Sequence, residues 1–151
     1  MSLAVIDASV LAVFYAADDP RHALVVERLK VGDALFAPAH LDAEIVSASR
    51  GMARSNQALD QVVPRALTHL AGFPIRRMPL PPLLDRMWEL RHNITAYDAA
   101  YVALAERLEA VLVTCDARFA AAGGPNCTFD QIIEKRATTR RSGGAQDRTH
   151  R

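Results

Sequence analysis

Short, continuous apolar runs separated by longer amphipathic segments constrain the fold of this 151-residue chain most. The clearest runs are LAVI (3–6), ALFA (34–37) and AVLVT (110–114), with weaker candidates at IRRMPL (75–80) and CTF (127–129). A strand buried on both faces of a parallel sheet has this continuous apolar pattern, and helices cover the two faces. The sequence therefore predicts an α/β domain with a mainly parallel sheet.

Segments with helical periodicity fill the intervals between the runs. A helix starting with Asp19 as N-cap and Pro20 at its first position is predicted to end at Gly32. Another, over 55–72, is predicted to bend or break near Pro64. The remaining predicted helices cover residues 9–16, 40–54, 82–91 and 93–110.

Length and charge divide the chain into two parts. Residues 1–133 suit a single domain with its own core, and half of the whole chain is hydrophobic. Residues 134–151 hold six basic and two acidic residues and no large apolar side chain, so we predict a basic, disordered tail. The rest holds 12 basic and 15 acidic residues, which excludes a protein that coats nucleic acid through its overall charge.

The sequence predicts a cytoplasmic protein with no membrane partner. Its two cysteines, Cys115 and Cys127, have no zinc spacing and form no disulfide framework, which favours a reducing compartment. The N-terminus has no basic stretch and carries Asp7 within its apolar run, unlike a signal peptide. No apolar run approaches the length that spans a membrane.

Two acids follow predicted strands directly. Asp7 comes immediately after LAVI, and Asp116 comes two residues after AVLVT. If the two strands are parallel neighbours, both carboxylates emerge at the same edge of the sheet. Ligands of parallel sheets bind at this edge, where the strands end.

Two further acids lie on predicted helices at positions that face the packing. Glu44 lies roughly 60° from Leu41 on a helical wheel, at the border of an apolar stripe. That stripe consists of Leu41, Ile45, Ala48 and Met52. Asp98 stands near the start of the helix YDAAYVALAERL, inside its apolar arc, with alanines around it that allow a neighbouring element to approach closely.

Each acid alone also has an ordinary structural explanation. Asp7 can cap the helix that follows it, and Asp116 can start a turn. Asp98 follows Thr95 by three, the spacing of a capping box, at a helix end that favours negative charge. Glu44 alone is an ordinary residue at the border of a helix face.

Taken together, the four acids indicate a metal site. Four carboxylates at one sheet edge cannot all be ionised without a compensating cation, and the chain has only two lysines, Lys30 and Lys135. Mg²⁺ or Mn²⁺ commonly binds a few carboxylates together with water and phosphate oxygens. Phosphate chemistry is the commonest use of such a site.

The motifs VIDASVL, LDAEIVSA, YDAAYVALAE and LVTCDARF, in this order and spacing, resemble those of PIN domains, and in particular of VapC toxins. The resemblance covers residues 3 to about 133. It implies a three-layer α/β/α sandwich around a parallel sheet of about five strands. It also implies a metal-dependent endoribonuclease, usually dimeric, that is silenced by a VapB-type antitoxin.

Carried over residue by residue, the resemblance assigns the acidic quartet of the family to Asp7, Glu44, Asp98 and Asp116. Ser9 and Thr114 match the hydroxyl positions that support it. Its implied chemistry is in-line attack of water on a phosphodiester, which leaves a 5′-phosphate and a 3′-hydroxyl. Position 116 varies more than the others within such domains.

Substrate contacts are less visible in the sequence. Arg118, two residues after Asp116, is the arginine closest in sequence to the predicted site and is a candidate phosphate ligand. The five histidines show no metal spacing and are interpreted as surface or core residues. Tyr97 and Tyr101, four apart on one helix face, are interpreted as core or interface residues.

Other acidic α/β phosphate enzymes fit less well. A haloacid-dehalogenase-type phosphatase needs an aspartate where Ser9 stands, and a receiver domain needs a lysine soon after the last clear strand. A P-loop is absent from the sequence. The alternative from another class is a catalytically silent PIN-fold protein that acts by binding RNA or a protein partner. Nothing in the residues themselves distinguishes RNA from DNA as a substrate.

Overall fold

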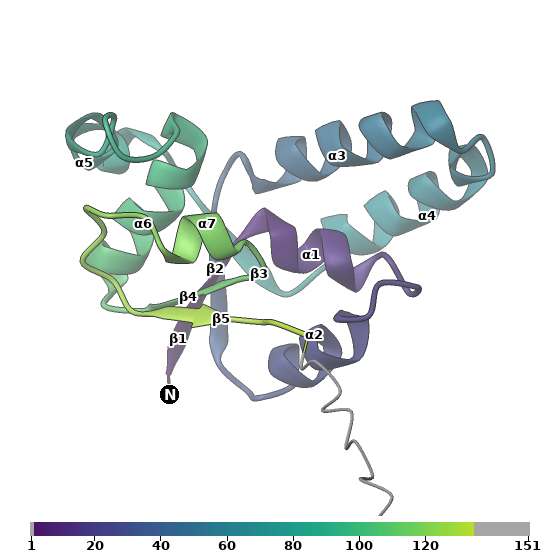
Figure 1. Cartoon of the computed structure of the whole chain (residues 1–151), viewed down its shortest axis with the longest axis horizontal. Helices are drawn as coiled ribbons and strands as arrows, with labels where there is room; N and C mark the ends of the chain where they lie inside the picture. The colour runs from purple at the N-terminus through teal and green to yellow at the C-terminus, as the bar shows by residue number, and fades with distance from the viewer. Residues whose placement is uncertain (1, 135–151) are drawn as a thin grey trace, which may run out of the picture.

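The computed structural model describes residues 2–134 and contains a five-stranded sheet in the order β3-β2-β1-β4-β5 (Figure 1). Every neighbouring pair of strands is parallel. The strands are β1 (Leu3–Ile6), β2 (Ala34–Pro38), β3 (Ile75–Met78), β4 (Val111–Thr114) and β5 (Phe129–Gln131). The predicted α/β fold with a parallel sheet is confirmed, and each predicted strand is present within two residues of its expected ends.

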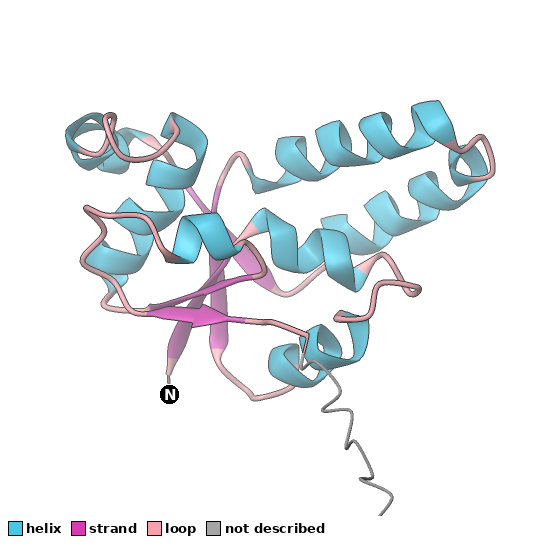
Figure 2. Cartoon of the chain, viewed as in Figure 1, coloured by secondary structure: helices cyan, strands magenta, loops and turns pink. Residues whose placement is uncertain are grey.

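Helices cover both faces of this sheet and make the predicted three-layer sandwich (Figure 2). Right-handed crossovers place the helices between β1 and β3 on one face, and those after β3 on the other, because the chain reverses direction across the sheet. The helices are α1 (Ala8–Phe14), α2 (His22–Leu29), α3 (Leu41–Ser55), α4 (Leu59–Ala71), the 3-10 turn η1 (Pro81–Leu83), α5 (Leu84–Glu89), α6 (Ala96–Leu108) and α7 (Ala117–Ala120).

Helix α6 lies at the centre of the packing. It contacts β1, β2 and β4, and its residues 99–105 are all buried. Ala99, Ala100 and Ala103 are small enough for the helix to lie close to the sheet, as the sequence predicted. The position of this helix also fixes Asp98 in its first turn.

Helices α3 and α4 form a hairpin that extends beyond the sheet (Figure 1). Of the predicted apolar stripe, Leu41 and Ile45 at the start of α3 are buried, whereas Ala48 and Met52 are exposed, so only the first turn of the stripe faces the core. Of the bend or break predicted near Pro64, the break is wrong, because α4 runs through this residue, and the bend stays a prediction. A proline removes one helical hydrogen bond, and at this exposed position that loss is tolerated.

The predicted start of the second helix is wrong, and the predicted disorder of the C-terminal tail is not tested. Helix α2 begins at His22, and the Asp19 carboxylate instead accepts hydrogen bonds from the backbone and side chain of Arg21. The predicted basic tail lies outside the described residues except for Glu134, so its disorder stays a prediction. Within residues 2–134 no helix combines the length and the apolar character that a membrane crossing requires.

Candidate functional site

The strand order places the topological switch point of the sheet at the carboxyl ends of β1 and β4, and the region at this edge is called the crevice below. The helices connected to these strands leave toward opposite faces of the sheet, and ligand sites of open α/β sheets form at such a switch point. Asp7 follows β1 directly, and its backbone N–H donates to the carbonyl of Val113 in β4 (3.0 Å). Asp116 follows β4 by two residues. The sequence therefore placed these two acids at the correct edge.

Asp7 is buried, and two hydroxyls bind its carboxylate. Ser9 Oγ donates to Oδ2 at 2.6 Å, and Thr114 Oγ1 donates to the same oxygen at 2.8 Å. Although Asp7 stands at the N-cap position of α1, its side chain makes no capping hydrogen bond. Burial raises the pKa of Asp7, while the two hydroxyls act in the opposite direction. Capping therefore does not explain Asp7.

The same two hydroxyls also organise the loop that carries Asp116. The backbone N–H of Cys115 donates to Ser9 Oγ (2.9 Å), and that of Asp116 donates to Thr114 Oγ1 (3.0 Å). Ser9 and Thr114 thus connect the ends of two strands that are more than 100 residues apart in the chain. This network fixes the backbone of both acids relative to each other.

Asp116 combines exposure with a structural role. Its Oδ1 accepts hydrogen bonds from the backbone N–H groups of Arg118 (2.9 Å) and Phe119 (3.3 Å) at the start of α7. Asp116 therefore has an ordinary structural role as well, since it caps the short helix α7. Arg118 is exposed two residues after Asp116, and its role as a phosphate ligand stays a prediction.

Asp98 is half-buried in the first turn of α6, and the charges of the other three acids affect its pKa. Thr95 caps this helix, because its hydroxyl accepts from the Asp98 backbone N–H (3.2 Å). Burial, and after it the charges of Asp7, Glu44 and Asp116, together raise the pKa of Asp98 to about 6. The structure thus brings the four predicted acids into one electrostatic cluster.

Glu44 reaches this cluster from α3 on the other side of the crevice. It lies with Asp98 in the lining of an open hollow of about 530 Å³ between α3 and the start of α6. Its Oε1 accepts a hydrogen bond from Tyr101 Oη (2.8 Å) and lies 3.0 Å from His40 Nε2. The Tyr101 side chain is fully buried, as predicted, whereas Tyr97 is 66% exposed, so its interpretation as a core residue is wrong.

Neither of these contacts to Glu44 was predicted from the sequence. A spacing signal was available for His40, which precedes Glu44 by one helical turn, whereas Tyr101 lies on another helix and no local spacing connects it to Glu44. Burial and the nearby carboxylates raise the pKa of Tyr101 far above its ordinary value, so its hydroxyl stays protonated and acts as a donor.

The four acids have no arginine or lysine partner among the described residues. Within 2–134, no arginine or lysine forms an ion pair with Asp7, Glu44, Asp98 or Asp116. Three arginines pair with acids outside this cluster: Arg21 pairs with Asp19, Arg77 with Asp42, and Arg86 with Glu106. The negative charge of the crevice is therefore uncompensated by these side chains.

The residues of the crevice fit a hard divalent cation by their chemistry. Carboxylate oxygens are the ligands that Mg²⁺ and Mn²⁺ prefer, and a cation there would remove the repulsion that raises the pKa of Asp98. The side chains are not arranged as a finished ligand set: in the described part of the chain, no three His, Cys, Asp or Glu side chains are gathered in a way that could hold an ion.

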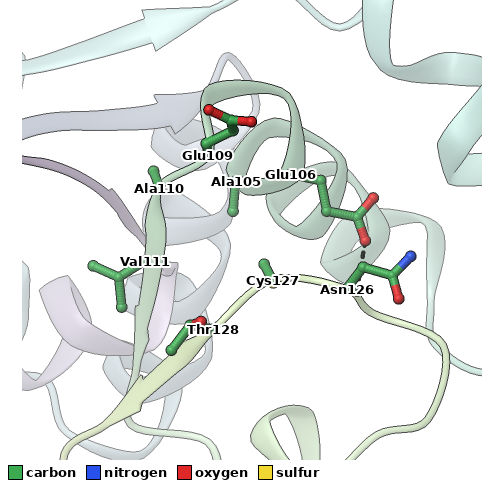
Figure 3. Close-up of a pocket in the computed structure, with 8 residues that line it drawn as sticks. All are labelled: Ala105, Glu106, Glu109, Ala110, Val111, Asn126, Cys127 and Thr128. Atoms are coloured by element: carbon green, nitrogen blue, oxygen red, sulfur yellow. Dashed lines mark hydrogen bonds between the residues drawn. The ribbon is translucent and has the colours of Figure 1, made fainter.

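A larger hollow, of about 720 Å³, lies at the opposite end of β4 (Figure 3). Its lining includes Glu106 and Glu109, whose side chains point in different directions. Glu106 already accepts from the backbone N–H of Asn126 (2.7 Å) and pairs with Arg86. This hollow therefore lacks the cluster of acids without basic partners that distinguishes the crevice at the carboxyl ends of the strands.

Comparisons with known proteins agree with this architecture. The PIN domain family model matches residues 4–125. Ribonuclease VapC12 of Mycobacterium tuberculosis is 38% identical over 128 residues, which is 85% of this chain and 98% of the relative. The crystal structure of PAE2754 from Pyrobaculum aerophilum has a TM-score of 0.60 and 27% identity, and the match covers 85% of this chain and 83% of that one.

A third similar structure is that of VapBC2 from Rickettsia felis, bound to a DNA fragment from its promoter. Its TM-score is 0.62 at 14% identity, with 87% of this chain and 99% of that chain covered, and this likeness bears on the fold alone. The chain belongs to the PIN-domain family. Within that family, it is related along nearly its whole described length to the VapC ribonucleases.

Proposed function

We propose that this protein is a metal-dependent endoribonuclease, the toxin of a type II toxin–antitoxin pair, which hydrolyses phosphodiester bonds in tRNA or another structured RNA. The observation that carries the proposal is the cluster of Asp7, Glu44, Asp98 and Asp116, which has no arginine or lysine partner within residues 2–134. The similarity to ribonuclease VapC12 supports the same activity.

Asp7, Asp98 and Asp116 are proposed to hold Mg²⁺ or Mn²⁺, with Glu44 as a further ligand or as the group that orients the attacking water. The bound cation would supply Lewis-acid activation of the phosphate and stabilise the charge that develops on its oxygens. Ser9 and Thr114 fix Asp7 through Oδ2, which limits rotation of its carboxylate. A cation there would lower the pKa of Asp98 and so favour its ionised form.

The remaining parts of the proposal concern substrate and partners. Arg118, exposed beside Asp116, is proposed to contact an RNA phosphate. A VapB-type antitoxin is proposed as the partner that silences the enzyme, on the basis of the VapC relatives and of the VapBC2 pair from Rickettsia felis. We further propose that the chain forms a homodimer, as the family resemblance implies.

Cleavage of total cellular RNA, including structured tRNA, tests the activity. Purified, antitoxin-free protein is incubated with Mg²⁺ or Mn²⁺, with chelator, and as the Asp98→Asn variant. We expect discrete fragments that require the cation and that disappear with Asp98→Asn. A well-folded protein that cleaves nothing would favour a PIN-fold binding protein instead. Equal cleavage by Asp98→Asn would remove that residue from the site.

A further inference from the structure

We propose that Tyr101 and His40 are positioning residues that hold one oxygen of Glu44 and leave its other oxygen directed to the reaction. This inference deepens the proposed function and rests on it. Glu44 is the acid whose position depends most on side chains from another helix, because it comes from α3 while Asp98 and Tyr101 come from α6.

Tyr101 provides the first contact. Its ring is fully buried among the core residues of α6, and its Oη donates to Glu44 Oε1 at 2.8 Å. A buried ring has little freedom to rotate, so the hydroxyl is fixed before any ligand arrives. The hydrogen bond joins residues 57 positions apart in the chain and therefore sets the distance between the two helices at the crevice.

His40 provides the second contact from the N-cap position of α3. Its Nε2 lies 3.0 Å from Glu44 Oε1 and 3.1 Å from the backbone carbonyl oxygen of Tyr97. Both neighbours are acceptors, so Nε2 carries a hydrogen and donates. The ring packs against the ring of Tyr101, with centroids 5.2 Å apart, and its Nδ1 is buried without a hydrogen-bond partner. The imidazole is thus fixed by packing and by Nε2 alone.

Both residues approach the same carboxylate oxygen. Tyr101 Oη donates a hydrogen bond to Glu44 Oε1, and His40 Nε2 lies 3.0 Å from that oxygen. Asp7 shows the same pattern, since Ser9 and Thr114 both donate side-chain hydrogen bonds to Oδ2. In each acid one oxygen is anchored and the second is left for a ligand. Outer-shell contacts of this kind orient metal ligands in proteins.

His40 also connects Glu44 to the backbone beside Asp98. The carbonyl that accepts its hydrogen bond belongs to Tyr97, the residue directly before Asp98. Tyr101 lies three residues after Asp98 on the same helix. The two positioning residues therefore fix the separation of Glu44 and Asp98 across the hollow between α3 and α6.

The experiment compares Tyr101→Phe, His40→Ala and His40→Gln with the wild type. Glutamine retains an N–H donor, whereas alanine retains none. Mn²⁺ affinity without RNA, kcat and KM for RNA cleavage, and thermal unfolding are measured for each. Tyr15→Phe is the matched control, because it also removes a hydroxyl hydrogen bond, to His69 at 2.8 Å, away from the crevice.

We expect Tyr101→Phe and His40→Ala to lower Mn²⁺ affinity or kcat about 10- to 100-fold with little change in KM. His40→Gln should recover most of the loss, and Tyr15→Phe should retain wild-type kcat. In a Glu44→Gln background, Tyr101→Phe should cause no further loss, because the group it positions is already altered.

Unchanged Mn²⁺ affinity and kcat in both Tyr101→Phe and His40→Ala would overturn the inference, as would equal losses in His40→Ala and His40→Gln. If Tyr101→Phe does not fold, the two His40 variants decide. If the wild type binds Mn²⁺ but cleaves no RNA, the proposed function fails and the Mn²⁺ affinities alone decide the inference.

Discussion

Two groups of acids at different places in this molecule have opposite electrostatic surroundings. Asp33, just before β2, and Asp130, in β5, share the guanidinium of Arg28 at 2.7 and 2.6 Å. The acids at the carboxyl ends of β1 and β4 have no such partner among residues 2–134. Hydrogen bonds from the Ser2 hydroxyl and from Arg28 lower the pKa of Asp33. Burial and like charges instead raise the pKa of Asp98 to about 6.

The difference indicates what each group does. A carboxylate paired with arginine stabilises the folded state at neutral pH, since its ionised form is favoured there. Unpaired carboxylates that repel one another cost stability, and such arrangements concentrate at functional sites. The Arg28 group is therefore structural, and the crevice is where we propose that a cation binds.

The largest expected effect comes from replacing one aspartate by asparagine in each of the two groups of acids. Asp7→Asn should reduce cation-dependent RNA cleavage about 100-fold or more, because a preorganised charged group is lost from the site. Asp33→Asn should leave cleavage unchanged and lower the free energy of unfolding instead. Cleavage rates and denaturant unfolding of both variants test this. Loss of cleavage in Asp33→Asn alone would reverse the comparison.

Removing the arginine of the structural group should affect stability only. Arg28→Ala leaves Asp33 and Asp130 without their shared donor, and we expect the free energy of unfolding to fall by about 1–3 kcal/mol. Lys30→Ala is the matched control near the end of the same helix, since Lys30 forms an exposed pair with Glu27. That pair should contribute less than about 1 kcal/mol. Similar stability of the two variants would contradict the structural role of Arg28.

The carboxyl ends of the strands could be located from the sequence, and the contacts between helices could not. LAVI and AVLVT identify β1 and β4, and parallel pairing then places Asp7 and Asp116 together. Met52 has the periodicity of a buried residue, yet it is exposed because α3 extends beyond the sheet, which depends on tertiary packing. The Tyr101–Glu44 hydrogen bond joins two helices whose relative position no local pattern encodes.

The raised pKa of Asp98 predicts a pH dependence with a defined sign. Between about pH 4 and pH 6 the folded state retains a proton on Asp98 that the unfolded chain has released, so raising the pH reduces the contribution of Asp98 to the stability of the wild type. Asp98→Asn lacks this loss, and its advantage over wild type should grow across the window by about 1 kcal/mol, allowing for the partial exposure of the carboxyl.

Unfolding measured in chelator at several pH values tests this shift, and added Mg²⁺ should reduce the loss in the wild type. The Arg28 group should behave oppositely: the lowered pKa of Asp33 contributes stability at neutral pH that is lost as the pH falls toward its folded-state pKa. A stability difference between wild type and Asp98→Asn that stays constant from pH 4 to pH 7 would contradict the repulsion in the crevice.

The smallest expected effect is on stability and distinguishes the role of Asp116 as a helix cap from its proposed role in cleavage. Asp116→Ala removes the cap of α7 and should cost about 1 kcal/mol, whereas Asp116→Asn keeps an acceptor and should cost little. Both variants should reduce cleavage, because both remove the charge. Thermal unfolding and cleavage assays run in parallel distinguish the roles. Full cleavage by Asp116→Asn would show that this residue acts only as a cap.

The most direct test of the cation site is a titration of the RNA-free protein with Mn²⁺, followed by electron paramagnetic resonance. Wild type and Asp33→Asn should bind the ion with the same affinity, and Asp98→Asn should bind it at least about tenfold more weakly, since a ligand carboxylate is lost. Equal binding by wild type and Asp98→Asn, or no binding by the wild type, would contradict the assignment of the crevice as a metal site.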